Sequence, residues 1–239
     1  MYNEELTIHS QINKLNKTLV ALNNEENQFH ILIADNGSTD RTKCIAESLA
    51  ASLDIVSLIS VGQKGVGLAL RKAWESSQAD IVGYMDLDLA TDIIHINEVI
   101  ATFLQEESDV INASRLLPTS SVQNRKISRT ISSRGFNSIL KLIFRTRVSD
   151  AMCGFKFLKR GVLQNALANG AKSDGWFFSA QLLLVTEMMG FRVKEIPVHW
   201  IDDGNSKVKV LSLSKQYLSE IFELRAEIKN SSYRNFIRL

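Results

Sequence analysis

Residues 81–88 read IVGYMDLD, a short apolar run followed by two carboxylates that one residue separates. An apolar run of this length predicts a buried strand. Because successive side chains of a strand point to opposite faces, we expect Asp86 and Asp88 to share a face and Leu87 to face the core. Carboxylates on one face repel each other unless a cation lies between them, and such hard oxygen ligands favour Mg²⁺ or Mn²⁺. The stretch predicts a divalent-metal site, with a solvated pair at a strand end as the alternative.

Strands and helices alternate around this stretch. Apolar runs typical of strands lie at 30–34, 54–60, 81–85 and 109–113. Helical patterns lie at 8–22, around 44–49, around 67–74 and at 92–106, the last with Thr91 as its cap. This alternation predicts an α/β fold with a parallel sheet, in which ligands bind beyond the carboxyl ends of the strands. Asp35 follows one of these strands, so we expect it to share a crevice with Asp86 and Asp88.

The later part of the chain has a looser pattern. We expect a basic helix with an apolar face at 127–144, a short strand at 154–158, a buried helix at 176–189, a strand at 191–200 and an amphipathic helix at 213–228.

One long stretch, from Val110 to Ser149, contains no acidic residue. Its basic residues are Arg115, Arg125, Lys126, Arg129, Arg134, Lys141, Arg145 and Arg147. Such an excess of positive charge favours an anionic partner, which could be a phosphate, a nucleic acid or an acidic membrane surface. Only Phe136 and Phe144 place aromatic rings among these charges, so we expect no nucleic-acid partner.

Composition narrows the class of protein. The 239 residues indicate one large domain or a domain with a small appendage. No apolar run approaches the roughly 18 residues that a membrane span requires, and no signal peptide is visible. Cys44 and Cys153 lack the spacing of a zinc site, so we expect reduced thiols in a cytoplasmic protein.

Several short motifs together resemble glycosyltransferase family 2, the inverting GT-A enzymes that use nucleotide sugars. The resemblance is strongest to the polyprenyl-phosphate glycosyltransferases, and within these to the dolichyl-phosphate β-glucosyltransferase branch. The motifs, in chain order, are Tyr2-Asn3-Glu4-Glu5, Asp35-Asn36-Gly37-Ser38-Thr39-Asp40, Lys64-Gly65-Val66-Gly67, Asp86-Leu87-Asp88, Ala113-Ser114-Arg115, Asp150-Ala151-Met152-Cys153-Gly154-Phe155-Lys156 and Ser206-Lys207.

The resemblance implies a single Rossmann-like GT-A domain over residues 1–239, with a mostly parallel central sheet flanked by helices. It assigns nucleotide-sugar binding to about 1–115 and acceptor binding to about 116–239. The family also places an apolar strand just before Tyr2. Here Met1 stands at that point, so the first strand of the sheet is missing from this sequence. We therefore expect the sequence to be incomplete at its N-terminus.

The resemblance also assigns roles on the donor side. It places Asp35 at the base of the nucleotide and Tyr2 and Glu4 along the base and ribose. Lys64, in a glycine-rich loop, would bind the diphosphate. The alternatives are a turn-forming Asp35, a first-turn helical Glu4 and a solvated Lys64. Asp86 would face the ribose and sugar, and Asp88 would ligate Mg²⁺ or Mn²⁺, which stabilises the departing diphosphate.

On the acceptor side, the resemblance implies a polyprenyl phosphate held by Arg115, Arg129 and Arg134. Arginines bind phosphate in bidentate fashion, and an ionised phosphate can attack without a strong general base. A solvated basic helix is the alternative. Further family positions near the acceptor are Lys156, Trp176 and Lys207.

Substrate choice depends on smaller differences. Ala90 stands where the mannosyl branch tends to have glutamine, which favours UDP-glucose over GDP-mannose. Ser179 and Gln181 stand where relatives often carry acids, so a catalytically silent nucleotide-sugar-binding protein is one alternative. A sugar nucleotidyltransferase is another. We expect peripheral contact with the cytoplasmic face of a membrane through the basic helix and its apolar side.

Overall fold

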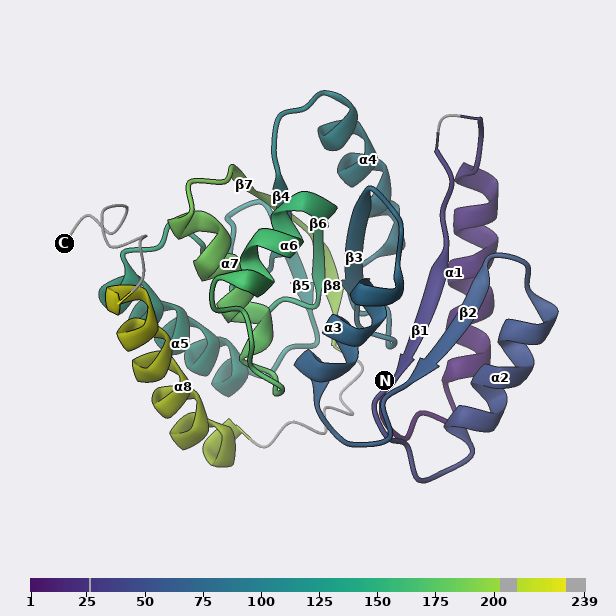
Figure 1. Cartoon of the computed structure of the whole chain (residues 1–239), viewed down its shortest axis with the longest axis horizontal. Coiled ribbons are helices and arrows are strands. Elements are labelled where there is room, and N and C mark those ends of the chain that lie inside the picture. The colour runs from purple at the N-terminus through teal and green to yellow at the C-terminus, as the bar shows by residue number, and fades with distance from the viewer. Residues whose placement is uncertain (26, 203–209, 231–239) are drawn as a thin grey trace. The chain divides into compact units, whose positions relative to one another are not determined.

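The structure is a computed structural model that describes residues 1–25, 27–202 and 210–230 (Figure 1). The chain forms two compact units. The first unit comprises Met1–Gln78 and Asp86–Leu89, and the second comprises Ala79–Met85 and Ala90–Leu239. The second unit thus includes residues on the N-terminal side of the expected division at about 115, because strands at 81–85 and 110–114 both pair with a strand at 155–159.

The first unit is built from two parallel strands and three helices. The strands are β1 (Ile31–Asp35) and β2 (Val56–Ser60), and the helices are α1 (Ile8–Leu22), α2 (Thr42–Ser52) and α3 (Val66–Ser76). The sequence has five apolar residues at helical spacing here. Ile8, Ile12, Leu15 and Leu19 are buried, and Leu22, at the end of α1, is half-buried. Parallel pairing brings the carboxyl ends of β1 and β2 together, with Asp35 opposite Ser60.

Met1 lies along the edge of β1 that β2 leaves open. Its amine donates to the Ala34 carbonyl at 2.8 Å, and its carbonyl accepts from the Asn36 amide at 2.9 Å. Two bonds of this kind, to residues on either side of Asp35, are the pattern of a parallel strand pair. Burial lowers the pKa of the Met1 amine, although the charges of Asp35 and Asp86 act in the opposite direction.

The second unit contains a four-stranded sheet of order β3-β6-β4-β7. Its strands are β3 (Ile81–Met85), β6 (Phe155–Lys159), β4 (Val110–Ser114) and β7 (Val193–Pro197). β6 runs antiparallel to both neighbours, whereas β4 and β7 are parallel. The strands are therefore mixed in direction, and the described strands form three separate sheets where the sequence predicts one central sheet.

A small parallel sheet pairs β5 (Ser121–Gln123) with β8 (His199–Ile201). The sequence predicts a single strand at 191–200, but the structure divides it into β7 and β8 at Val198. Pro197 ends β7, consistent with the missing N–H that prevents a proline from donating to a ladder. β5 has only three residues, and no sequence pattern predicts it.

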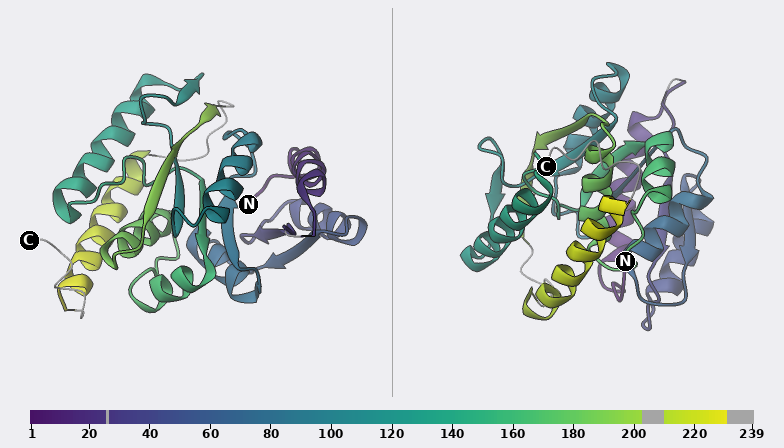
Figure 2. Two further views of the ribbon diagram at one scale, coloured as in Figure 1. Left: turned by 90° about the horizontal axis from the view of Figure 1, so that it is seen from above. Right: turned by 60° about the vertical axis from the view of Figure 1, so that its left-hand side comes forward.

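Helices complete the second unit. They are the 3₁₀ turn η1 (Ile93–His95), α4 (Ile96–Leu104), α5 (Ile127–Phe144), α6 (Arg160–Ala168), α7 (Phe178–Met188) and α8 (Val210–Asn230). Asp92, not Thr91, caps the first of these, because its carboxylate accepts from the Ile94 amide. α7 is buried from Phe178 to Thr186, as expected. α5 and α8 run side by side, with the Phe136 and Tyr217 rings 5.5 Å apart between centroids (Figures 1 and 2).

Within the described ranges, no helix combines the length and the apolar character needed to cross a bilayer.

Candidate functional site

In the first unit, a carboxylate is held at the end of β1. Asp35 is buried, and its two oxygens accept from the Ser38 amide at 3.1 Å and from the Ser60 hydroxyl at 2.8 Å. Burial alone would raise the pKa of Asp35, but the bonds from Ser38 and Ser60, with the Met1 charge, hold it below its ordinary value. Asp35 is therefore an ionised acceptor for a polar ligand at this strand end.

Two loops interlock beside Asp35. The Asn36 side-chain oxygen accepts from the Gly65 amide, which ties the loop after β1 to the loop after β2. Gly37 has φ +71°, and a Cβ there would lie 3.0 Å from the Gln63 carbonyl carbon. Only glycine suits both this backbone conformation and this close approach. The second loop also carries Lys64, whose Nζ lies 4.0 Å from the centre of the Tyr2 ring.

The segment that contains Tyr2 and Glu4 is fixed to the start of α2. The Asn3 amide donates to the Ser38 hydroxyl at 3.0 Å, and the Glu4 amide donates to the Thr42 hydroxyl at 2.7 Å. The Glu4 carboxylate accepts from the Thr7 hydroxyl at 3.0 Å, within the turn that precedes α1. Tyr2, Asp35 and Lys64 thus gather at one end of the first unit, and their roles in donor binding stay predictions.

The acidic pair lies in a turn. β3 ends at Met85, and the Leu89 amide donates to the Asp86 carbonyl at 3.1 Å, with Leu89 at φ +50°. The alternation of side chains in a strand therefore does not set the directions of Asp86 and Asp88, and that part of the sequence argument was wrong. Both carboxylates are exposed. Asp86 lies near enough to the Met1 amine for its charge to act on it, as Asp35 does.

Carboxylate oxygens are the donors that Mg²⁺ and Mn²⁺ prefer, so the exposed pair fits such an ion by donor chemistry. Across residues 1–25, 27–202 and 210–230, no three His, Cys, Asp or Glu side chains come close enough together to hold a metal by themselves. A metal at this turn would need further oxygen ligands from a bound molecule or from water.

In the second unit, Arg115 is paired with a fully buried carboxylate. Its Nε and Nη2 donate to the two oxygens of Asp150 at 2.7 and 2.9 Å, and its amide donates to Asp150 at 3.2 Å. Burial would raise the pKa of Asp150, but the charge and hydrogen bonds of Arg115, with the charge of Lys156, hold it below its ordinary value. Asp150 therefore stays ionised and fixes the Arg115 fork in one direction.

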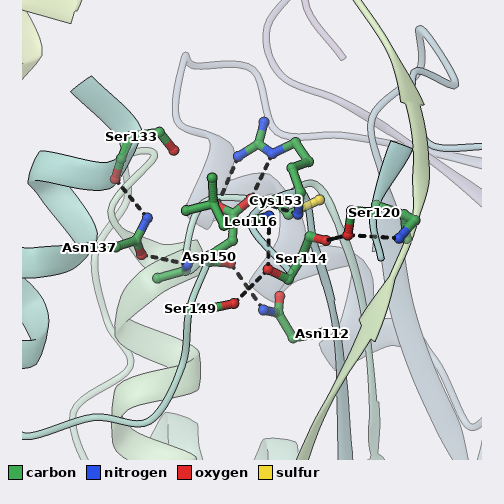
Figure 3. A network of polar contacts seen from close by, with 12 residues as sticks. Asn112, Ser114, Leu116, Ser120, Ser133, Asn137, Ser149, Asp150 and Cys153 are labelled. Atoms are coloured by element: carbon green, nitrogen blue, oxygen red, sulfur yellow. Dashed lines mark hydrogen bonds and ion pairs between the residues drawn. The ribbon is translucent and has the colours of Figure 1, made fainter. Parts of the chain in front are cut away.

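A polar network supports this pair (Figure 3). Asn112 donates to the Asp150 carbonyl at 3.0 Å, and the hydroxyls of Ser114 and Ser149 lie 2.6 Å apart. Asn137 of α5 accepts from the Ala151 amide at 2.9 Å. These bonds join β4 and the middle of α5 to the segment that begins at Ser149.

Two arginines lie over the ring of Trp200 in β8, and a third binds a residue close to it in the chain. The guanidinium carbons of Arg115 and Arg125 lie 5.4 and 5.5 Å from its ring. Arg129 donates to Asp202, which lies two residues after Trp200. The Arg129 side chain remains 28% exposed. Arg115 and Arg129 thus lie in one region with Arg125, Trp200 and Asp202, and the acceptor role of the two expected arginines stays a prediction.

The other expected acceptor residues take different positions. Arg134 is exposed on α5, and Trp176 is 38% exposed just before α7. Lys156 is fully buried: its ammonium donates to the Cys153 carbonyl and lies 5.6 Å from the Tyr84 ring. Lys207 lies outside the described residues.

The two positions that replace family acids have clear structural contacts. The Ser179 hydroxyl lies 2.5 Å from the Tyr84 hydroxyl and donates to the Ala151 carbonyl at 3.2 Å. The Gln181 oxygen accepts from the amides of Lys172 and Ser173 at 2.9 and 2.8 Å. Both side chains hold loops beside α7.

Sequence reasoning missed the roles of Arg125, Trp200 and Asp202. Arg125 was visible in the acid-free stretch, but it precedes α5, so helical spacing could not have related it to Arg129. Nothing local to Trp200 or Asp202 indicated their proximity to these arginines, because the pairing of β5 with β8 joins segments about 80 residues apart.

Strand-end carboxylates, a glycine-rich loop and a mixed sheet define the α/β class of GT-A glycosyltransferases. The chain matches glycosyl transferase family 2 over residues 1–167 and belongs to that family.

Similar proteins agree with this assignment. Glycosyltransferase AglD of Haloferax volcanii is 33% identical over 228 residues, which cover 93% of this chain and 36% of AglD. Dolichyl-phosphate beta-glucosyltransferase ALG5C of Trichomonas vaginalis is 25% identical, over 82% of this chain and 59% of that protein. Dolichyl-phosphate beta-glucosyltransferase of Dictyostelium discoideum is 24% identical, over 94% of this chain and 71% of that protein. The chain thus spans only about a third of AglD and three fifths of ALG5C.

Solved structures share the fold. Glucosyl-3-phosphoglycerate synthase of Mycobacterium tuberculosis superimposes with a TM-score of 0.67 at 17% identity, over 95% of this chain and 78% of that chain. Its complex with Mn²⁺, UDP-glucose and glycerol 3-phosphate gives a TM-score of 0.63 at 16% identity, again over 95% of this chain and 78% of that chain. These values confirm the GT-A fold class.

Proposed function

We propose that this chain transfers a hexose, with glucose favoured, from a nucleotide diphosphate sugar to a polyprenyl phosphate with inversion. The observation that carries the proposal is the arginine-rich region around Trp200, within a family 2 glycosyltransferase. Arg115, Arg125 and Arg129 gather there, with Arg115 paired to Asp150 and Arg129 paired to Asp202. Guanidinium groups bind phosphates in bidentate fashion, so this region suits an acceptor that carries a phosphate.

The donor would bind at the ends of β1 and β2. Asp35, an ionised and buried acceptor, suits the N–H groups of a nucleobase. Lys64 and the uncapped amides at the start of α3 suit a diphosphate. Asp88, with Asp86, would hold Mg²⁺ or Mn²⁺, which neutralises charge on the departing diphosphate when it is bound.

Arg129 and Arg115 would have different roles in binding the acceptor phosphate. Arg129 is partly exposed and pairs with Asp202 through one nitrogen, so a phosphate can compete for its remaining donors. Arg115 is largely buried and oriented by Asp150, so it would supply a fixed positive charge. The phosphate oxygen, already ionised, then needs no protein base to attack the anomeric carbon.

We also propose that α5 rests on an anionic membrane surface. Its exposed residues include Ile127, Ile131 and Leu142, with exposed fractions of 79%, 66% and 83%. Arg134, Lys141 and Arg145 are exposed on the same helix or at its end. Exposed apolar residues beside basic ones are typical of helices that lie in a bilayer interface. The cytoplasmic face, which presents anionic lipids, would suit this charge.

A transfer assay tests the proposal. The chain is incubated with a labelled nucleotide sugar, polyprenyl phosphate and Mn²⁺, and the organic extract is analysed for lipid-linked label. We expect label from UDP-glucose, with release of UDP. Label from GDP-mannose alone would assign the mannosyl reaction. Release of pyrophosphate, or tight donor binding without turnover, would overturn the proposal in favour of a nucleotidyltransferase or a silent binding protein.

A further inference from the structure

Arg125 differs from Arg115 and Arg129 in forming no ion pair within the described part of the chain. It follows β5 and Asn124, which turns the chain at φ +58°. Its guanidinium lies over the buried Trp200 ring, on which Arg115 also lies. Arg115 pairs with Asp150 and Arg129 pairs with Asp202, whereas no carboxylate among the described residues forms an ion pair with Arg125.

Within the ranges that the structure describes, Arg125 also has an unsatisfied hydrogen-bond donor, and its charge is repelled by neighbouring arginines. The Arg125 Nε is buried and has no hydrogen-bond partner among the described residues. Burial, followed by repulsion from Arg115, lowers the pKa of Arg125 to about 10, and Arg129 adds to this effect while Asp150 opposes it. A buried donor without an acceptor and a cation beside two others both cost stability. An anion placed beside Arg125 would relieve both.

We propose that Arg125 binds the anionic oxygens of the phosphate acceptor and that its cation–π contact with Trp200 holds it in place. The proposal rests on the proposed function, and it adds an acceptor-binding residue to Arg115 and Arg129. The Arg125 guanidinium lies over the Trp200 ring at cation–π distance, 5.5 Å from its centroid. Such a contact does not use the N–H groups, so they remain able to donate to a phosphate. Arg125 and Trp200 would therefore fix the position of the phosphate as well as its charge.

The test uses farnesyl phosphate as a short polyprenyl phosphate and compares Arg125→Gln with the wild type. Calorimetric titration should show farnesyl phosphate binding weakened by about tenfold or more, with UDP binding unchanged. Because the substitution removes an unmatched cation, we expect its Tm to equal or exceed that of the wild type. Arg147→Gln is the matched control, since Arg147 is exposed in the same acid-free stretch and should leave binding unchanged.

Arg125→Lys keeps the charge but loses the planar fork, and should give an intermediate affinity that supports the same conclusion if Arg125→Gln fails to fold. Wild-type affinity for farnesyl phosphate in the folded variants would overturn the inference, as would equal weakening of UDP and farnesyl phosphate. Absence of farnesyl phosphate binding by the wild type would overturn it too. Binding that depends on Arg125 without any hexose transfer would reject the proposed reaction but retain this anion site.

Discussion

Asp150 and Arg115 illustrate how a single pair constrains the acceptor region. Asp150 is fully buried, and three donors of Arg115 contact its carboxylate. Because removal of one partner from a buried pair leaves an uncompensated charge, such pairs are sensitive to single substitutions. Arg115 therefore contributes to stability, and a test of its role in acceptor binding must measure stability and binding separately.

We predict that Arg115→Ala lowers the free energy of unfolding by about 3–5 kcal/mol, because Asp150 then remains buried without its counter-charge. Urea denaturation measures this effect. The double variant Arg115→Ala/Asp150→Ala should recover part of the loss, since both charges are gone. Additive losses in the two single variants and the double variant would show that the pair is not coupled.

Gly83 of β3 lies where the structure leaves no space for a side chain. A Cβ at this position would lie 2.2 Å from Cδ1 of Phe157 and 2.7 Å from the Lys156 carbonyl oxygen. We predict that Gly83→Ala destabilises the protein by about 1–3 kcal/mol, because β6 must shift to admit it. Thermal unfolding measures the loss.

Gly161 of α6 provides the control for Gly83, because nothing lies within 4 Å of a Cβ built there. Gly161→Ala should be neutral or stabilising by about 0.5–1 kcal/mol. Equal stability of Gly83→Ala and the wild type would contradict the close contact between β3 and β6.

At the scale of elements, Asp109 ties three strands of the second unit together. It precedes β4, bonds Lys159 at the end of β6 at 3.1 Å, and accepts from the Arg192 guanidinium, just before β7, at 3.1 Å. The hydrogen bonds from Arg192, and then those from Lys159, hold the pKa of Asp109 well below its ordinary value, although partial burial opposes them.

A lowered carboxyl pKa in the folded state adds stability above the unfolded pKa, about 3.9, and this stability is lost as pH falls toward the folded pKa. We therefore predict that Asp109→Asn lowers Tm near neutral pH and that its difference from the wild type shrinks below about pH 3. Thermal unfolding across this range measures the effect. A difference that is constant with pH would contradict the role of the Asp109 charge.

Several elements could be predicted from the sequence because their signals are local. The periodic apolar residues of α1 gave its bounds, and the apolar run at 81–85 gave β3. Other features depend on contacts between distant segments. The antiparallel pairing of β3 with β6 buries Lys156, and the pairing of β5 with β8 brings Trp200 to Arg125, and neither pairing has a local signal. The turn at Asp86 depends on where β3 stops pairing.

At the scale of the whole molecule, the exposed face of α5 predicts reversible binding to membranes. Replacing Ile131 and Leu142 by Asp should weaken binding to anionic vesicles by about tenfold or more, because it removes apolar area and adds repulsion. Vesicle co-sedimentation measures this. The control is Leu104→Asp on α4, a residue 62% exposed and outside the acid-free stretch. Equal binding of both variants would contradict a membrane role for α5.

Transfer itself is tested most directly by the Asp88 carboxylate. The wild type and Asp88→Ala are given labelled UDP-glucose, polyprenyl phosphate and Mn²⁺, and lipid-extractable label is measured over time. We predict label that requires the added metal and falls by about 100-fold or more in Asp88→Ala, while Tm is unchanged. Lipid-linked label formed at the wild-type rate by Asp88→Ala, or no label from the folded wild type with either UDP-glucose or GDP-mannose, would contradict metal-assisted transfer to a lipid phosphate.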